Sequence, residues 1–399
     1  MDDLQDGIKE NLIIQKKFKR KKYTKPLIFN IIDHFISVNN LICYGGIAIN
    51  TIIPKERFYD EIDIPDYDCF STNALNDAKK LSILLSKHET IEVKSAMFKG
   101  TYKIYVNFIP MVDFTQIDTH LFKKIKDSAL KIKDIYYSSP NYLRMNIHLE
   151  LSRPLGDIDR WNKIYHRLEL LNKYYPFTYT TNINVIPVTN IDIYNDVATI
   201  CKKWPILGEY AMKYYYSFFP KKINISNSNI FIFSETLGEV KHALKGIKYK
   251  IVSYSNKFIS NFYEFIFNGE SLLYVFITDS CQSYNEIKEK GEIIKVANID
   301  SMLMIYYALS FIQPPSLNIN NLLVYCYLLQ NMNISINKSK NKNILKRFHL
   351  PCIGNQSTFE DIRRERDKMF KLYKKNRSKK IYNNYFFRFV PNQTRKNKI

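Results

Sequence analysis

Two aspartates separated by a single residue are the most distinctive chemical feature of this sequence. Asp66 and Asp68 flank Tyr67 where a short apolar segment begins, a pattern typical of a β-strand. Because side chains alternate between the faces of a strand, we expect both carboxylates on one face and Tyr67 and Cys69 on the other. Neighbouring carboxylates repel each other and need cations, and oxygen ligands of this kind suit Mg²⁺ or Mn²⁺.

A third carboxylate, Asp113, lies in the otherwise apolar segment Ile109–Phe114. A buried carboxylate is costly unless it is paired or bound to a metal. We therefore expect Asp113 on a strand beside Asp66 and Asp68, completing a site for two ions that drive in-line displacement at phosphorus. The alternatives are an ordinary acidic turn at residues 66–68 and a strand end facing water at Asp113.

Gly45 and Gly46 follow the apolar segment Leu41–Tyr44 and precede a helical pattern that ends at Pro54. Glycine has no Cβ, so a triphosphate could approach the backbone closely here, and the following helix start would add N–H donors. A tight turn would explain the two glycines equally well. They therefore indicate nucleotide binding only together with the three aspartates.

The elements that must position these residues alternate between helix and strand. We expect helices over residues 26–36, 47–53, 74–87 and 141–172, and strands over 41–44, 67–70, 91–98, 101–108 and 111–114. This order predicts a mixed α/β (α+β) fold. We place a domain boundary in the less periodic segment 174–195, which gives domains 1–185 and 186–399, with basic segments at residues 16–25 and after Asn376. The second half also alternates, but no sequence repeat is visible.

The composition favours a polyanionic partner. Lys and Arg number 59 against 38 Asp and Glu, a formal net charge of +21, and such a field attracts nucleic acid. A basic but merely solvated surface is the alternative. Basic residues cluster just after the catalytic region, where some are expected to contact the triphosphate or the RNA backbone. They are Arg144, Arg153, Arg160 and Lys163, and salt bridges to acidic neighbours are the alternative for them.

The six cysteines form no CxxC motif, and none lies near a histidine at metal-ligand spacing. We therefore expect neither a zinc site nor a disulfide framework, and we infer a reducing, intracellular compartment. The N-terminal residues lack the apolar core of a signal peptide. No segment approaches the roughly 20 apolar residues that span a bilayer, so no membrane association is expected.

Taken together, the motifs resemble the polymerase-β-like nucleotidyltransferases. Their context is similar to the poly(A) polymerase catalytic subunits of large cytoplasmic DNA viruses, especially the mimivirus-like group. The stretches that carry the resemblance are Tyr44–Asn50, Pro65–Phe70, Gly100–Tyr105, Leu149–Asp157, Arg160–Lys163, Asn298–Leu303 and Gly354–Gln356.

This resemblance implies a nucleotidyltransferase domain followed by a second, degenerate copy of it. It implies ATP and an RNA 3′ end as substrates, with Gly45, Gly46, Arg153, Arg160 and Lys163 among the binding residues. Asp66 and Asp68 would hold both metal ions, and Asp113 the ion that activates the 3′-hydroxyl. A homodimer is implied rather than a separate processivity factor, located in the viral factory of the host cytoplasm or packaged in the virion.

Three readings remain at this point. The first is the RNA adenylyltransferase. The second is another nucleotidyltransferase, acting either as a terminal uridylyltransferase or on small molecules, although small-molecule substrates give less reason for the +21 charge. The third is a non-catalytic RNA-binding subunit on the same fold, in which the three acids would be expected to decay.

Overall fold

The structure is a computed structural model, and it describes residues 2–23, 25–59, 63–64, 66–176, 183, 187–219, 229–255, 258–278, 280–332, 348, 350–373 and 379–391. The chain forms two compact units: Met1–Leu143 together with Phe359–Ile399, and Arg144–Thr358. This division differs from the boundary expected at residue 185. The segment from Phe359 onward packs with the N-terminal residues, so the first unit is discontinuous in sequence.

The first unit is built on one eight-stranded mixed sheet with the strand order β16-β3-β4-β5-β2-β1-β7-β6. Its strands are β1 (Ile42–Tyr44), β2 (Tyr67–Ser71), β3 (Ile91–Ser95), β4 (Thr101–Val106), β5 (Ile109–Gln116), β6 (Leu130–Ile132), β7 (Ile135–Tyr137) and β16 (Arg388–Phe389). Its helices are α1 (Asp2–Tyr23), α2 (Pro26–Val38), α3 (Gly45–Ile52), α4 (Ala74–Leu85), α5 (Thr119–Asp127), α13 (Phe359–Tyr373) and α14 (Lys379–Phe386).

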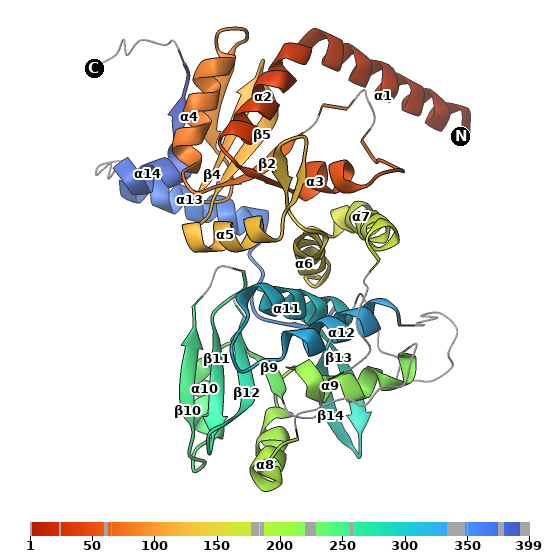
Figure 1. Cartoon of the computed structure of the whole chain (residues 1–399), viewed down its shortest axis with the longest axis vertical. Helices are drawn as coiled ribbons and strands as arrows, with labels where there is room; N and C mark the ends of the chain where they lie inside the picture. The colour runs from red at the N-terminus through yellow and green to blue at the C-terminus, as the bar shows by residue number, and fades with distance from the viewer. Residues whose placement is uncertain are drawn as a thin grey trace. The chain divides into compact units, whose positions relative to one another are not determined.

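Helices α2 and α4 lie against this sheet, as Figure 1 shows. Helix α2 has Pro26 in its first turn, where the missing N–H costs nothing, and it buries Ile28, Ile32, Phe35 and Ile36. The strands β3 and β4 form a hairpin that turns at Gly100, whose φ of +85° favours glycine. The strand β16 pairs with β3 at the sheet edge, which ties the C-terminal segment to the first unit.

The second unit has its own eight-stranded sheet, ordered β10-β11-β12-β9-β8-β14-β13-β15. Its strands are β8 (Ile206–Leu207), β9 (Ile230–Ser234), β10 (Lys250–Tyr254), β11 (Phe262–Phe267), β12 (Glu270–Ile277), β13 (Gln282–Glu289), β14 (Glu292–Ala297) and β15 (Cys352–Ile353). Its helices are α7 (Trp161–Tyr174), α8 (Ile191–Cys201), α9 (Gly208–Tyr215), α10 (Leu237–Ala243), α11 (Ile299–Ile312) and α12 (Ile319–Gln330), with 3₁₀ turns at η1 (Ile158–Arg160) and η2 (Tyr216–Phe218).

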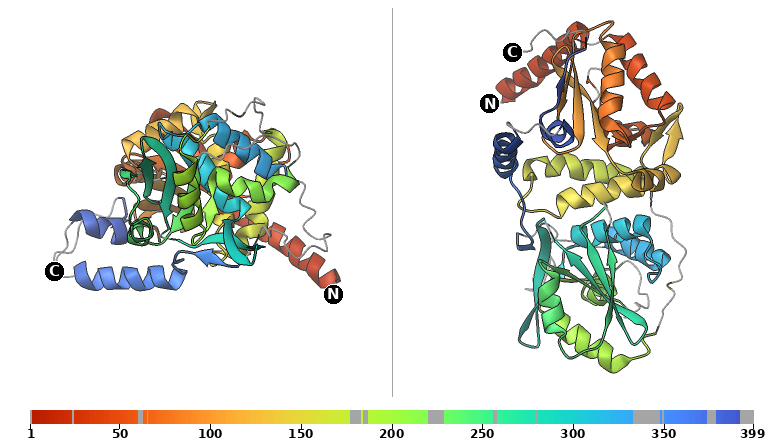
Figure 2. Two further views of the ribbon diagram at one scale, coloured as in Figure 1. Left: turned by 90° about the horizontal axis from the view of Figure 1, so that it is seen from below. Right: turned by 90° about the vertical axis from the view of Figure 1, so that its left-hand side faces the viewer.

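Helix α6 (Pro140–Leu151) contains the division between the units, because the second unit begins at Arg144. In the second unit, α11 and α12 pack side by side (Figures 1 and 2). Helix α11 is buried along almost its whole length, so it forms the centre of this unit's core. No helix within the described ranges is both long enough and apolar enough to cross a membrane.

The two sheets share one topology. The order β3-β4-β5-β2-β1-β7-β6 in the first matches β10-β11-β12-β9-β8-β14-β13 in the second. The central strand directions also agree: β1–β2 and β8–β9 are antiparallel, whereas β2–β5 and β9–β12 are parallel. In each unit the first of these strands leads directly into a helix that begins with glycine, α3 or α9. The two units therefore have the architecture of a duplication.

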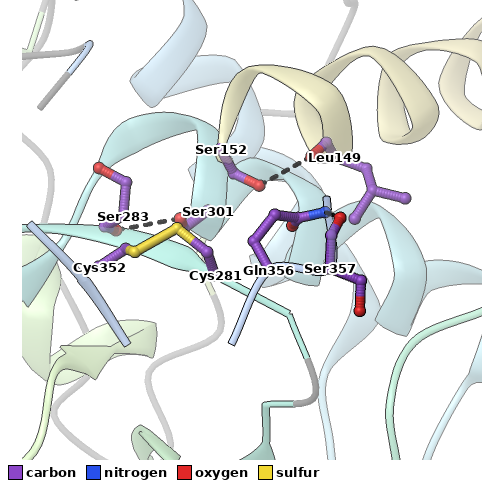
Figure 3. Close-up of a disulfide and its surroundings, with 8 residues drawn as sticks. All are labelled: Leu149, Ser152, Cys281, Ser283, Ser301, Cys352, Gln356 and Ser357. Carbon is purple, nitrogen blue, oxygen red and sulfur yellow. Dashed lines mark hydrogen bonds between the residues drawn. A yellow bond between two sulfur atoms is a disulfide. The ribbon is translucent and has the colours of Figure 1, made fainter. Parts of the chain in front are cut away.

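One expectation about the cysteines is wrong. Cys281 and Cys352 form a disulfide across a sequence separation of 71, with their Cα atoms 5.4 Å apart (Figure 3). The antiparallel pairing of β13 with β15 brings them together, since Ser283 pairs with Cys352. Sequence spacing does not reveal such a contact. The other four cysteines are buried thiols, and Cys43 Sγ lies 3.4 Å from Cys69 Sγ.

Candidate active site

Three neighbouring strands bring the predicted carboxylates together. Tyr44 at the end of β1 pairs with Asp68 in β2, and Asp68 pairs in turn with Asp113 in β5. Paired residues on adjacent strands point to the same face of a sheet, so the Asp68 and Asp113 side chains are neighbours. Asp66 lies just before β2 and is more exposed, but its charge acts on Asp113. As expected, Tyr67 and Cys69 are buried.

Gly45 is required by its contact with Asp68. Its φ is +67°, and a Cβ added there would lie 2.6 Å from Asp68 Oδ2. Both observations exclude a side chain, because the conformation is strained for other residues and the carboxylate occupies the space. The chain turns here from the extended Tyr44 into α3, whose second residue is the buried Gly46. The first backbone N–H groups of α3 therefore begin beside Asp68.

Tyr44, the residue before this turn, is held by side chains of the sheet. Its ring stacks on Phe70 with centroids 3.9 Å apart, and its hydroxyl lies 2.9 Å from the hydroxyl of Thr115. After α3, the Asn50 carboxamide oxygen accepts hydrogen bonds of 3.0 Å from the backbone N–H groups of Phe58 and Tyr59. The connection between α3 and β2 is thereby held at its start.

Sequence reasoning missed one residue of this site, Lys103. Its ammonium nitrogen Nζ lies 2.8 Å from Asp113 Oδ2, and the two residues pair across β4 and β5. Burial raises the pKa of Asp113 to about 6, with a smaller contribution from the charge of Asp66, while Lys103 acts in the opposite direction. The alternation of side chains along β4 together with the β4–β5 register could have identified Lys103.

The donor set fits a hard divalent cation. Asp113 Oδ1 is buried, and within the described residues it has no hydrogen-bond partner. An orphaned carboxylate oxygen beside a second carboxylate suits Mg²⁺ or Mn²⁺, which bind oxygen ligands. Asp66 does not join the other two in a ready-made cluster: in the part of the chain that the structure describes, no three His, Cys, Asp or Glu side chains form one. Lys103 is the cation that now faces Asp113.

The four basic candidates all belong to the second unit, whereas the aspartates and glycines belong to the first. Arg144 is 2% exposed and donates hydrogen bonds to the Asn172 side chain and the Leu171 carbonyl, so its role is structural. Arg160 Nη1 lies 3.7 Å from Glu150 Oε2, the salt bridge foreseen as the alternative. Lys163 is exposed, and Arg153 lines a cavity of this unit.

The second unit preserves the framework of this site without its chemistry. Gly208 has a φ of +75° and follows an extended residue, Leu207, as Gly45 follows Tyr44. The register pairs Leu207 with Phe231 and Phe231 with Tyr274. Phe231 and Tyr274 therefore stand at the positions equivalent to Asp68 and Asp113.

The positions equivalent to Asp66 and Lys103 also carry different residues in the second unit. Asn229 corresponds to Asp66, since it precedes Phe231 by two residues. Glu264 pairs with Tyr274 as Lys103 pairs with Asp113. In place of two carboxylates and an ammonium, this unit has an aromatic pair, with the Phe231 and Tyr274 ring centroids 5.0 Å apart. The second unit therefore repeats this backbone framework with no carboxylates at the positions equivalent to Asp66, Asp68 and Asp113.

Comparisons with known proteins agree with this description. Residues 30–157 match the model of a family described as "Poly(A) polymerase catalytic subunit", a range that contains both glycines and all three aspartates. The chain is 30% identical over 161 residues to a protein of Acanthamoeba polyphaga mimivirus, covering 39% of this chain and 27% of that protein. It is 29% identical over 190 residues to a protein of African swine fever virus, covering 45% of this chain and 38% of that protein.

Both of these relatives carry the name of a poly(A) polymerase catalytic subunit, so the resemblance expected from the sequence is confirmed. The chain spans well under half the length of either one. Among solved structures it is similar to the Megavirus polyadenylate synthase, with a TM-score of 0.77 at 20% identity, covering 98% of this chain and 86% of that one. The expected nucleotidyltransferase fold is thereby confirmed over nearly the whole chain.

Proposed function

We propose that this chain is a poly(A) polymerase catalytic subunit, which transfers AMP from ATP to the 3′-hydroxyl of RNA without a template. The observation that carries the proposal is the pairing of Asp68 with Asp113 across β2 and β5, directly beside the glycine turn into α3. The family match covers this same region. A net charge of +21 suits an RNA substrate.

In the proposed reaction, the RNA 3′-oxygen attacks the α-phosphorus of ATP in line. A bond forms from the 3′-oxygen to the α-phosphorus, the bond from the α-phosphorus to the bridging oxygen of the β-phosphate breaks, pyrophosphate leaves, and the proton of the hydroxyl passes to water. The chemistry supplied by bound divalent ions is activation of the attacking hydroxyl and stabilisation of the leaving group. Asp66 and Asp68 would hold both ions, and Asp113 the one on the hydroxyl side.

The other residues bind and orient. The backbone at Gly45 and Gly46 would receive the triphosphate, since no side chain stands in its way and the first N–H groups of α3 begin there. Lys103 would keep Asp113 ionised until a metal ion replaces it as the neighbouring charge. Arg153, Arg160 and Lys163 stay candidates for contacts with the triphosphate or the RNA backbone.

The proposal includes the setting of the enzyme. Its substrates would be ATP and an RNA 3′ end, and its ions Mg²⁺ or Mn²⁺. We expect a homodimer that needs no separate processivity factor, located in the viral factory of the host cytoplasm or packaged in the virion. Sedimentation of the purified chain at micromolar concentration would test the dimer independently of activity.

The decisive test is extension of a short labelled RNA with each of the four nucleoside triphosphates, in Mg²⁺ and in Mn²⁺. Wild type should produce long ladders with ATP, and the double variant Asp66→Ala/Asp68→Ala should produce none. Preference for UTP would instead support a terminal uridylyltransferase. No incorporation by a wild-type protein that still binds RNA would support a non-catalytic subunit.

A further inference from the structure

The second unit contains a cavity whose lining does not include Phe231 or Tyr274, the residues equivalent to Asp68 and Asp113. Its volume is about 380 Å³, within the range of small-molecule sites, which is roughly 300–1,000 Å³. It opens at the carboxyl ends of the parallel strands β9 and β12, where Phe233, Phe276 and Thr278 line it. The carboxyl ends of parallel strands are a common place for ligands in α/β sheets.

One buried polar group in this cavity lacks a hydrogen bond. Gln282 is 4% exposed, and among the described residues its side-chain oxygen Oε1 has no hydrogen-bond partner. A buried acceptor without a donor has lost its hydrogen bonds to water and gained none in the protein. Gln282 lines the cavity, so a ligand with an N–H group could supply the missing hydrogen bond.

The other lining side chains define the rest of such a ligand. Phe233 and Phe276 are almost completely buried, and Phe258 lines the cavity while stacking on Phe311 with ring centroids 5.5 Å apart. Aromatic surfaces of this kind accept a flat nucleobase. Arg153 supplies a guanidinium to the same cavity, the group best suited to bind phosphate.

The wall that carries Gln282 is firmly held. The disulfide of Cys281 with Cys352 is adjacent to it in sequence, and the backbone N–H of Ser283 donates to the Ser152 carbonyl at 3.0 Å. This last bond also fixes the residue that precedes Arg153 (Figure 3 shows Ser152 and Ser283 beside the disulfide). The cavity is therefore preorganised on the side that holds its acceptor and its cation.

At the corresponding strand end of the first unit, a side chain bridges the turn from β2 into α4. Gln116, which corresponds to Ile277, donates to the Thr72 carbonyl at 2.6 Å and accepts from the Ala74 backbone N–H at 2.8 Å. Its carboxamide thus seals the turn from β2 into α4. An apolar isoleucine at the equivalent position of the second unit cannot make these bonds.

We propose that this cavity binds a single adenine nucleotide, with the base against the ring of Phe258, its amino group donating to Gln282 Oε1, and its phosphate at Arg153. Glutamine recognises adenine through its amino group, and the carboxamide oxygen left open here accepts such a donor. The nucleotide is either free AMP or one adenylate of an RNA chain, which present the same chemistry. The site does not depend on the proposed catalytic activity.

Equilibrium dialysis of radiolabelled AMP against the full chain in EDTA tests this site. We expect saturable binding, weakened at least tenfold by Gln282→Leu and by Asn261→Trp, which would fill the cavity mouth from an exposed position. Gln330→Leu makes the same chemical change outside the cavity and should leave binding unchanged. Asp68→Asn should also bind normally, which separates this site from the proposed active site.

Competition identifies the source of the nucleotide. Stronger displacement by a short oligoadenylate than by AMP assigns the site to RNA, and equal or weaker displacement assigns it to the free nucleotide. The proposal is overturned if AMP does not bind at millimolar concentration, if CMP binds equally well, or if Asp68→Asn abolishes binding. Binding that Asn261→Trp leaves intact would also overturn it, whether or not Gln282→Leu folds.

Discussion

The candidate active site of the first unit and its counterpart in the second unit have the same backbone arrangement but different side chains. Both have an extended residue, a left-handed glycine and a helix, followed by a parallel strand pair. At the paired positions the first unit has Asp68 and Asp113, and the second has Phe231 and Tyr274. The fold therefore provides the positions, while the side chains alone decide whether they can hold a metal ion.

The glycines at the two turns are required by the same kind of close contact. A Cβ at Gly45 would meet a carboxylate oxygen at 2.6 Å, and a Cβ at Gly208 would meet Phe231 Cγ, also at 2.6 Å. The neighbour changed from carboxylate to aromatic ring, yet in both units it occupies the space of a side chain. Gly208 is thus maintained by packing alone, whereas Gly45 also serves the proposed site.

Substitutions at the paired positions should give the largest difference in activity between the two units. Asp113→Ala should lower adenylate transfer by roughly 10³-fold, about 4 kcal/mol, because it removes a metal ligand at the reacting centre. Tyr274→Phe, at the equivalent position of the second unit, should leave the transfer rate unchanged. Primer extension under single-turnover conditions measures both, and an equal loss in the two variants would contradict the assignment.

The disulfide should stabilise the second unit but not the first. Cys281→Ser should lower the free energy of unfolding by about 2–4 kcal/mol, because the bond closes a long loop. Backbone hydrogen exchange in β13 should accelerate. Exchange in β1 and β2 should not, because Cys43 and Cys69 in these strands are thiols without a disulfide. The same pattern is expected when wild type is treated with a reductant, and uniform acceleration in both units would argue against it.

Alanine at the two glycines should separate activity from packing. Both variants should lose about 1–3 kcal/mol of stability from backbone strain and crowding. Gly45→Ala should in addition lower adenylate transfer by roughly 100-fold, since it displaces Asp68 and obstructs the phosphate path. Thermal unfolding and transfer rates, measured on fully folded protein, would show whether Gly208→Ala spares activity as expected.

Lys103 should set the lowest pH at which the proposed site binds a metal ion. Burial raises the pKa of Asp113 to about 6, and Lys103 opposes this rise, so Lys103→Met should raise that pKa further. Because a metal ion needs the ionised carboxylate, the acid limb of Mn²⁺ binding should move upward by about one pH unit. Lys94 lies on the neighbouring strand β3, where it pairs with Glu92. Lys94→Met should leave the acid limb of Mn²⁺ binding in place.

For Asp113 itself, the sign of the pH effect follows from this raised pKa. The folded protein holds a proton on Asp113 more tightly than the unfolded chain does, so this residue favours folding below pH 4 and loses that contribution as pH rises through about 6. Asp113→Asn should therefore show a flatter stability curve between pH 4 and 7. A curve unchanged from wild type would contradict the raised pKa.

Much of the site was determined by the sequence alone. The spacing of Asp66 and Asp68 in an apolar strand, the isolated Asp113 and the glycine pair depend on local periodicity, which a chain carries in its order of residues. The main helices and strands of the first half followed from the same local patterns.

Only the tertiary structure decided what depends on contacts between distant residues. The partner of Asp113 is Lys103 because β4 pairs with β5 in one register, and Cys281 meets Cys352 because β15 pairs with β13. The return of Phe359 onward to the first unit, and the equivalence of Gly208 with Gly45, likewise rest on strand order. Register is set by the packing of whole faces, so it cannot be derived from the spacing of residues within one segment.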